Sequence, residues 1–262
     1  MLLMTTNTKQ TLFIIGGIVI LMFILSRGGM LKNPFASGGD RGAVVLNGVS
    51  AKERIFVDNV AQESQRTTGG RLIYVTPGQR DVLISKEGYW PWLKQVSVEK
   101  GQAVQLSPFF FRQQPVLEEL QQDDPEYDAL VALTEKKPIP ETLDILTSSG
   151  KTVTLWKKDN TLFAHWIGEG EPPSFFCAEQ CQSIIEFWHI ATPLSQILFW
   201  GHRDDVVIVV LENAVYALEL DRKPIQNFQK LYEGKTQPGI GSTKNGALYL
   251  YEEGQLYYLA NE

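Results

Sequence analysis

The feature that most constrains this chain is an apolar run near its N-terminus, Thr11 to Ser26, which reads TLFIIGGIVILMFILS. No charged residue lies between Lys9 and Arg27. A membrane-spanning helix normally needs about 20 apolar residues. This run is shorter, so Gln10 and Arg27 would lie near the two interfaces. We expect residues 11–26 to form an uncleaved signal-anchor helix in contact with membrane lipid, preceded by a short head of residues 1–10.

Two alternatives to the anchor stay open at this point. A cleaved secretory signal fits the length, but no small-x-small cleavage site follows Leu25. The second alternative is that the run forms a helix buried in the core of a domain. The charges flanking the run do not orient it clearly, and they lean slightly towards a cytoplasmic C-terminal side. Long domains translocate largely regardless of such charges, so the nature of the following domains must decide the orientation.

The overall charge excludes one class of partner. The chain has 262 residues, with 24 Lys and Arg against 30 Asp and Glu, for a net charge of −6. It contains no basic stripe, which makes a nucleic-acid partner unexpected. Aromatic residues make up 11% of the chain, which suits β-structure.

Residues 27–42 are rich in glycine and lack periodicity, which indicates a flexible tether. Residues 43–111 then alternate short apolar runs with Gly, Pro, Asn and Asp. Strands this regularly spaced predict a small β-sandwich. The candidate strands are Ala43–Leu46, Arg54–Val57, Arg71–Val75, Arg80–Ile84, Gln95–Val98 and Ala103–Leu106.

Four short motifs in this region resemble the PEGA domain in their order and spacing. They are Ile55–Asp58, Val75–Val82 with its Pro-Gly turn, Lys86–Tyr89, and Val96–Gly101. The chain departs from that family after Asp58, where Asn59 and a longer polar segment replace the usual glycine-containing loop. The resemblance covers about a quarter of the chain. It implies an immunoglobulin-like surface module without catalysis, in an extracytoplasmic position on a prokaryotic envelope.

Residues 112–142 are acidic and punctuated by proline, which predicts a linker with a short helix that begins at Asp124-Pro125-Glu126. In residues 143–262 a hairpin pattern occurs three times, with turns at Asp159-Asn160, Glu212-Asn213 and Glu253-Gly254. The second turn residues are Asn160, Asn213 and Gly254. They are spaced 53 and 41 residues apart, which is close to the repeat length of a propeller blade.

A closed propeller needs at least four blades, and only two to three fit here. The predicted fold class is therefore mainly β: an N-terminal transmembrane helix, a small PEGA-like β-sandwich and a partial β-propeller-like C-terminal domain. Open sheet edges promote association. We expect the sandwich, the linker or another chain to cover them, and oligomers could form through them.

Few residues suggest chemistry. Gly150-Lys151-Thr152 and Gly234-Lys235-Thr236 match only the tail of a phosphate loop, and neither opens a helix. His165, His189 and His202 lie in or beside strand-like runs without a catalytic motif around them. We predict no catalytic, cofactor-binding or metal-binding residue.

Two groups of residues are candidate sites. Cys177 and Cys181 are expected to form a disulfide if the domain lies outside the cytoplasm, although a helix could hold this spacing without a bond. Tyr89, Trp90 and Trp92 form an aromatic cluster that either covers the core of the sandwich or contacts a carbohydrate or peptidoglycan, whose sugar rings suit flat aromatic faces.

The sequence thus predicts a membrane-anchored, non-enzymatic envelope protein, with most of the chain extracytoplasmic, that binds an envelope protein or a cell-wall glycan. The first alternative is a subunit or sensor of a cell-surface assembly whose partial propeller is completed by a partner. The second is a carbohydrate-active enzyme.

Overall fold

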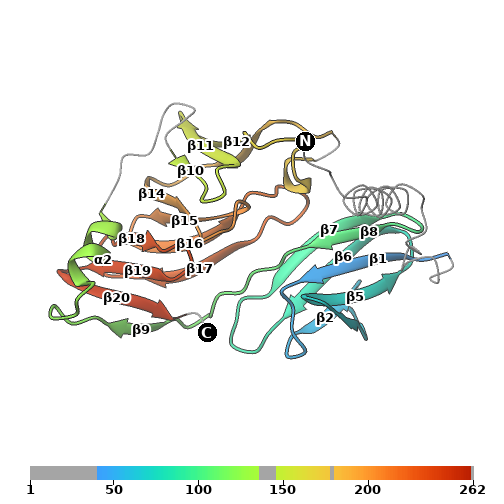
Figure 1. Cartoon of the computed structure of the whole chain (residues 1–262), viewed down its shortest axis with the longest axis horizontal. Coiled ribbons are helices and arrows are strands. Elements are labelled where there is room, and N and C mark those ends of the chain that lie inside the picture. Colours follow the sequence, from blue (N-terminus) through green and yellow to red (C-terminus); the bar gives the residue numbers. More distant parts are fainter. Residues whose placement is uncertain (1–39, 136–145, 178–179, 261–262) are drawn as a thin grey trace, which may run out of the picture.

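The computed structural model describes residues 40–135, 146–177 and 180–260. The described strands form five four-stranded sheets. Two of these sheets make an N-terminal sandwich, and the other three stack in a C-terminal unit (Figure 1). We call the latter the three-sheet unit.

The sandwich has two sheets. One has the order β4-β5-β1-β8 and includes a parallel pair, β1 and β8. The other has the order β3-β2-β6-β7 and is purely antiparallel. Their strands are β1 (Gly42–Asn47), β2 (Arg54–Val57), β3 (Val60–Ala61), β4 (Gln65–Thr67), β5 (Gly70–Val75), β6 (Gly78–Ser85), β7 (Trp92–Val98) and β8 (Ala103–Leu106). The short strand β4 lies within the polar segment that follows Asn59.

Alternation of apolar and polar residues fixes which face of each strand is buried. Along β7, buried and less buried residues alternate without a break. Trp92, Val96 and Val98 lie in the same core cluster as Val44 and Ile73 of the other sheet. The two sheets therefore bury one shared apolar layer.

The three-sheet unit repeats one arrangement three times. Sheet I runs β10-β11-β12-β13, sheet II runs β14-β15-β16-β17, and sheet III runs β18-β19-β20-β9. The bounds are β9 (Val116–Glu119), β10 (Leu146–Thr147), β11 (Val153–Lys158), β12 (Thr161–Trp166), β13 (Ile184–His189), β14 (Leu194–Phe199), β15 (Val206–Leu211), β16 (Ala214–Glu219), β17 (Phe228–Glu233), β18 (Gly239–Ser242), β19 (Leu248–Glu252) and β20 (Gln255–Ala260). All pairings in these sheets are antiparallel, as in propeller blades.

The three predicted hairpins are present at the centres of the three sheets. Each turns over two residues, because Lys158 pairs with Thr161, Leu211 with Ala214, and Glu252 with Gln255. The first turn residue has a positive φ in every case, between 51° and 52°. Two-residue hairpin turns require this left-handed backbone at a central position.

The linker contributes a strand that sequence reasoning missed. Residues Val116–Glu119 form β9, which pairs with β20 and completes sheet III. The helix α2 (Tyr127–Thr134) follows, and it begins after Glu126. The Asp124 side chain does not cap this helix. It accepts a hydrogen bond from the backbone nitrogen of Gln121 at 3.0 Å.

Helix α2 packs closely on β18 of sheet III. A Cβ atom placed on Gly241 would lie 2.7 Å from Leu133 Cγ, and one on Gly239 would lie 2.4 Å from the carbonyl oxygen of Thr134. Only glycine allows this approach. Tyr127 and Leu130 are buried against Leu256 beneath the helix, so α2 covers one face of sheet III.

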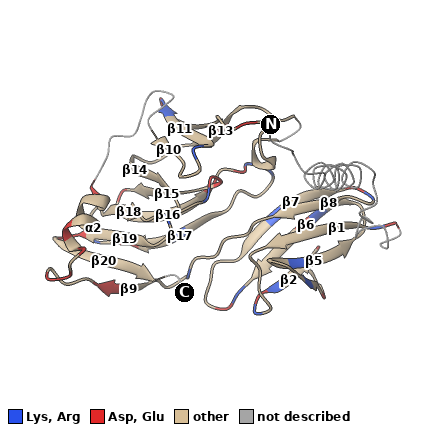
Figure 2. Cartoon of the chain, in the orientation of Figure 1, with Lys and Arg blue, Asp and Glu red and all other residues tan. Residues whose placement is uncertain are grey.

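Acidic residues gather around this end of the molecule. Figure 2 shows Asp and Glu residues, in red, on β9 and around α2. Glu118 and Glu119 are exposed on β9, which is the outer strand of sheet III. Charges on an outer strand disfavour pairing with another chain.

The predicted fold class needs one correction. The transmembrane helix was expected over residues 11–26, which lie outside the described residues. Within the described part of the chain, no helix is long and apolar enough to cross a membrane. Helix α2, with eight residues, spans only about 12 Å against the roughly 30 Å of a bilayer core. We therefore describe the fold as mainly β, with five small sheets, and do not retain the anchor or the membrane contact.

Candidate ligand-binding groove

The predicted aromatic cluster lies at the junction between the sandwich and sheet II. Trp92 is only 1% exposed and belongs to the core, and Tyr89 is also buried. Trp90 is half-buried, and its indole nitrogen donates to the carbonyl oxygen of Lys230 at 2.8 Å. Burial leaves little free ring surface on Tyr89 and Trp92, so these rings serve mainly to cover the core and to dock the sandwich.

A buried ion cluster holds the two units together. Lys94 on β7 is 1% exposed, and its Nζ atom lies 2.9 Å from Glu219 Oε2 and 3.2 Å from Asp221 Oδ2 of the three-sheet unit. Burial raises the pKa of Glu219, and the nearby Lys94 opposes that rise. An ion pair removed from water in this way needs good geometry to offset its loss of hydration.

The amide of Asn227 continues this junction. Its Oδ1 atom accepts from the backbone nitrogen of Leu93 at 3.1 Å, and its Nδ2 atom donates to the Leu93 carbonyl oxygen at 3.0 Å. The backbone nitrogen of Gln95 donates to the carbonyl oxygen of Pro224 at 3.4 Å. The segment 224–227 thus hydrogen-bonds to the outer edge of β7 much as a neighbouring strand would.

Arg203 forms a second tie between the units. Its guanidinium donates to the carbonyl oxygens of Ser107 and Pro108 at 2.5 and 3.2 Å. It also pairs with Asp205 at 2.6 Å. With the ion cluster, this contact fixes the sandwich against sheet II.

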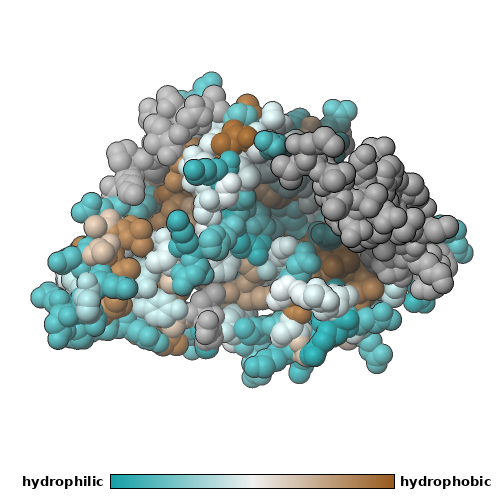
Figure 3. All heavy atoms as spheres, in the orientation of Figure 1, coloured by the Kyte–Doolittle hydropathy of each residue, from teal (hydrophilic) through white to brown (hydrophobic). Residues whose placement is uncertain are grey.

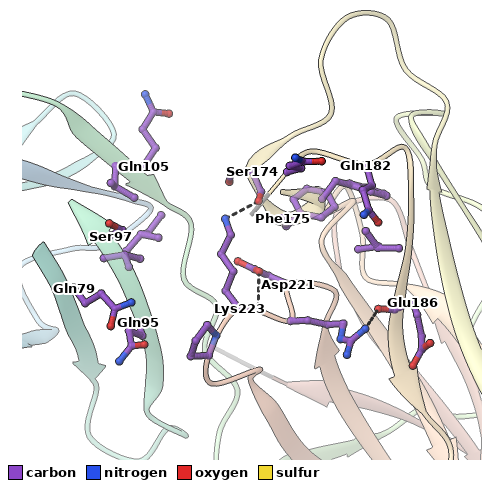
Figure 4. Close-up of a pocket in the computed structure, with 18 residues that line it drawn as sticks. Gln79, Gln95, Ser97, Gln105, Ser174, Phe175, Gln182, Glu186, Asp221 and Lys223 are labelled. Atoms are coloured by element: carbon purple, nitrogen blue, oxygen red, sulfur yellow. Dashed lines mark hydrogen bonds between the residues drawn. The ribbon is translucent and has the colours of Figure 1, made fainter. Parts of the chain in front are cut away.

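A groove of about 990 Å³ lies beside this junction. One wall comes from β6, β7 and β8 of the sandwich, and the other comes from the segment between β12 and β13 and the loop after β16. Figure 4 shows Gln79, Gln95 and Ser97 on the sandwich wall and Phe175 and Gln182 on the opposite wall. In Figure 3, hydrophilic residues lie in the recess in the middle of this face, with hydrophobic residues at parts of its edge.

Most charged side chains in the groove already have partners in the protein. Lys223 Nζ donates to the carbonyl oxygen of Ser174 at 2.7 Å, and Arg222 Nη1 donates to that of Glu186 at 2.6 Å (Figure 4). Asp221 binds Lys94 and accepts from the backbone nitrogen of Lys223. Uncharged amides, the hydroxyls of Ser97 and Ser174, the Phe175 ring and the exposed Glu186 carboxylate are the groups left to meet a ligand, and these suit a polar one.

The predicted disulfide residues border the groove. Cys177 and Cys181 are joined in the structure. Cys177 follows the short 3-10 helix Ser174–Phe176, in which Phe175 lines the groove and Phe176 is buried in the core. The bridge lies next to Phe176, Gln180 and Gln182, which line this wall.

The residues considered for chemistry are not assembled into a reactive site. Thr152 of the first phosphate-loop-like motif bonds to Asp204, and Thr236 of the second donates to Glu252. His189 Nδ1 lies 3.3 Å from Thr161 Oγ1. Among the described residues, no group of three or more His, Cys, Asp or Glu side chains could hold a metal ion.

Sequence reasoning missed the junction residues Lys94, Glu219 and Asn227. One signal was available for Lys94, because it falls in the inward-facing register of Trp92, Val96 and Val98. A lysine in a core register must find a buried partner.

Comparisons with known proteins identify no family. No family model matches the chain, and no curated protein matches it. A solved structure described as a putative peptidase M23 from Pseudomonas aeruginosa aligns with 83% of this chain and 86% of its own, at 12% identity. Its TM-score is 0.17, and this likeness carries no argument about fold or activity.

Proposed function

We propose that this chain is a non-enzymatic binding protein of the cell envelope, and that the groove between its two units is the binding site. The observation that carries the proposal is the composition of that groove. Three of its four charged side chains, Lys223, Arg222 and Asp221, are engaged within the protein, while Gln79, Ser97 and Gln182 line its walls. A site rich in uncharged hydrogen-bonding groups suits an envelope protein segment or a cell-wall glycan.

The junction supports this role because binding improves when a site is preorganised. The Lys94 cluster, the Asn227 amide and the Arg203 contacts tie the two walls together. A ligand would meet walls already held in position.

Two further expectations are part of the proposal. The cysteine bridge favours an oxidising, extracytoplasmic compartment. The sandwich is proposed to be PEGA-like, because the Thr76-Pro77-Gly78 turn joins β5 to β6 and Gly88-Tyr89 precedes β7, as that resemblance implies. The alternative of a subunit or sensor completed by a partner stays a prediction.

Site-specific photo-crosslinking tests the groove. A photoreactive phenylalanine analogue would replace Ser97 or Gln182 in the full-length chain, and Ile167 in a control. Ile167 is 43% exposed and lies outside the groove lining. Irradiation in envelope preparations of the source cells should give the same adduct, protein or glycan, from both groove positions and not from the control. Equal labelling at all three positions, or none at the groove positions, would refute the proposal.

A further inference from the structure

One edge of the sandwich faces the groove without a partner strand. Strand β8 is the last in the order β4-β5-β1-β8, and it pairs only with β1 among the described strands. Val104, Gln105 and Leu106 of this strand line the groove. An open strand edge is a ready template for a further strand.

The direction of the backbone groups follows from the pairing with β1. The backbone nitrogen of Ala43 donates to the carbonyl oxygen of Gln102 at 2.9 Å. Successive residues of a strand direct their backbone groups to opposite sides. Gln102, Val104 and Leu106 therefore face β1, whereas Ala103 and Gln105 direct their N–H and C=O groups to the outer edge.

This edge lacks the protection found on β9, the outer strand of sheet III. Its sequence Ala-Val-Gln-Leu carries no charge. By contrast, β9 exposes Glu118 and Glu119 along its length. Charged residues are a common means of preventing non-specific strand pairing. Their absence from β8 is compatible with functional pairing between this strand and a ligand.

The neighbouring edge shows this kind of recognition within the molecule. On β7, Leu93 exchanges two hydrogen bonds with the Asn227 amide, and Gln95 bonds to Pro224. These contacts end before Ser97, which is exposed and lines the groove. The edge of β7 from Ser97 onward and the edge of β8 are therefore accessible to a ligand.

We propose that the ligand of the groove is an extended polypeptide that adds as a strand to the free edge of β8. This inference rests on the proposed function. Main-chain hydrogen bonds would supply affinity, and side-chain contacts would supply selectivity. The four residues of β8 span about 13 Å, so the paired core of the ligand would be four to five residues long. Val104 and Phe175 favour apolar side chains on that ligand.

A generic strand-forming peptide tests the inference, because main-chain pairing is largely independent of sequence. The probe is a capped octapeptide of alternating threonine and valine with a lysine at each end, added to the ¹⁵N-labelled full-length protein. Amide exchange of Ala103 and Gln105 should slow at least tenfold when the peptide binds. The Val104 amide, already directed to β1, should change little and serves as an internal control.

Two substitutions at Gln105 separate pairing from other contacts. Gln105→Pro removes the outward N–H without removing a bond to β1, and it should weaken peptide binding at least tenfold. Gln105→Thr keeps the N–H and should bind within a factor of three of the native protein. Because proline could disturb the strand, a probe N-methylated on its central residues gives a second measurement and should also lose binding.

Several results would overturn the inference. They are absence of binding at millimolar peptide, binding without protection of Ala103 and Gln105, and undiminished binding of the N-methylated probe. A glycan adduct from the crosslinking experiment would also overturn it while leaving the proposed function intact. Failure of the proposed function would instead appear as the absence of any adduct specific to the groove.

Discussion

The charge of Lys94 should be essential for the stability of the junction between the two units. Lys94→Met removes the cation but keeps the length of the apolar stem. Glu219 is 4% exposed, and in the variant its carboxylate would lose the ion-pair partner at 2.9 Å. Breaking a buried pair in this way typically costs about 3 to 5 kcal/mol. For a chain of this size that corresponds to a fall in melting temperature of roughly 6 to 20 °C.

The cost should depend on pH in a defined direction. Burial already raises the pKa of Glu219, and Lys94 opposes the rise, so removing Lys94 should raise the pKa further. A carboxyl whose pKa is higher in the folded state contributes stability that is present at low pH and is lost as pH rises through the folded pKa. The penalty of Lys94→Met should therefore be larger at pH 7.5 than at pH 5.

Urea unfolding followed by tryptophan fluorescence measures both effects, since the chain has six tryptophans. Lys100→Met is the matched control, because Lys100 pairs with Asp40 at an exposed site and should change the unfolding free energy by less than about 0.5 kcal/mol. The double variant Lys94→Met with Glu219→Gln should recover much of the loss. A Lys94→Met cost below about 1 kcal/mol, or one equal at both pH values, would refute this reasoning.

Three further predictions concern the three-sheet unit. Gly241→Ala should destabilise the protein by about 1 to 3 kcal/mol in thermal unfolding, because the added Cβ would meet Leu133 at 2.7 Å; an equal effect from Ala132→Ser, on the exposed side of α2, would contradict this. A fragment of residues 143–262 lacks β9 and α2, so it should aggregate or unfold at a lower temperature than a fragment of residues 43–262. Light scattering and thermal melting measure these two properties. A monomeric shorter fragment that melts no lower would show that the sheets need no cover. Partial burial raises the pKa of Glu252, but hydrogen bonds from Tyr232 and Thr236 outweigh this and lower it below its usual 4.5. The stability that this carboxylate contributes should be present above pH 4.5 and lost as pH falls through the lower folded pKa. The difference in unfolding free energy between the native protein and Glu252→Gln should therefore shrink below pH 4.5. A difference that stays constant with pH would exclude the mechanism.

Local pattern was sufficient to predict the hairpins of the three-sheet unit. Each combines alternating apolar residues with a two-residue turn, and both signals act within a dozen residues. Strand β9 gave no such signal, because Val116–Glu119 is short and follows Pro115 without a hairpin partner. Its pairing with β20 depends on residues near the C-terminal end of the chain.

The candidate groove was harder to predict than the sheets. Its walls belong to two units, and their approach depends on tertiary contacts such as those of Lys94 and Asn227. The cysteine spacing left two outcomes open, because residues four apart also meet on a helix. In the structure Cys177 has extended backbone angles, with φ −111° and ψ 101°, and the pair is bridged. The aromatic cluster was visible, but the contact of Trp90 with Lys230 depends on the unit that packs against the sandwich.

The position of β9 has a consequence for how the chain is made. Sheet III unites a strand from the middle of the sequence with three strands at its C-terminal end, and Glu119 must find Tyr257. During synthesis the sandwich and sheets I and II emerge first and can fold while β9 and α2 still have no partner. Contacts this distant in sequence form slowly. The last sheet can therefore close only after nearly the whole chain has left the ribosome, and until then the apolar side of α2 is a natural site for a chaperone to bind.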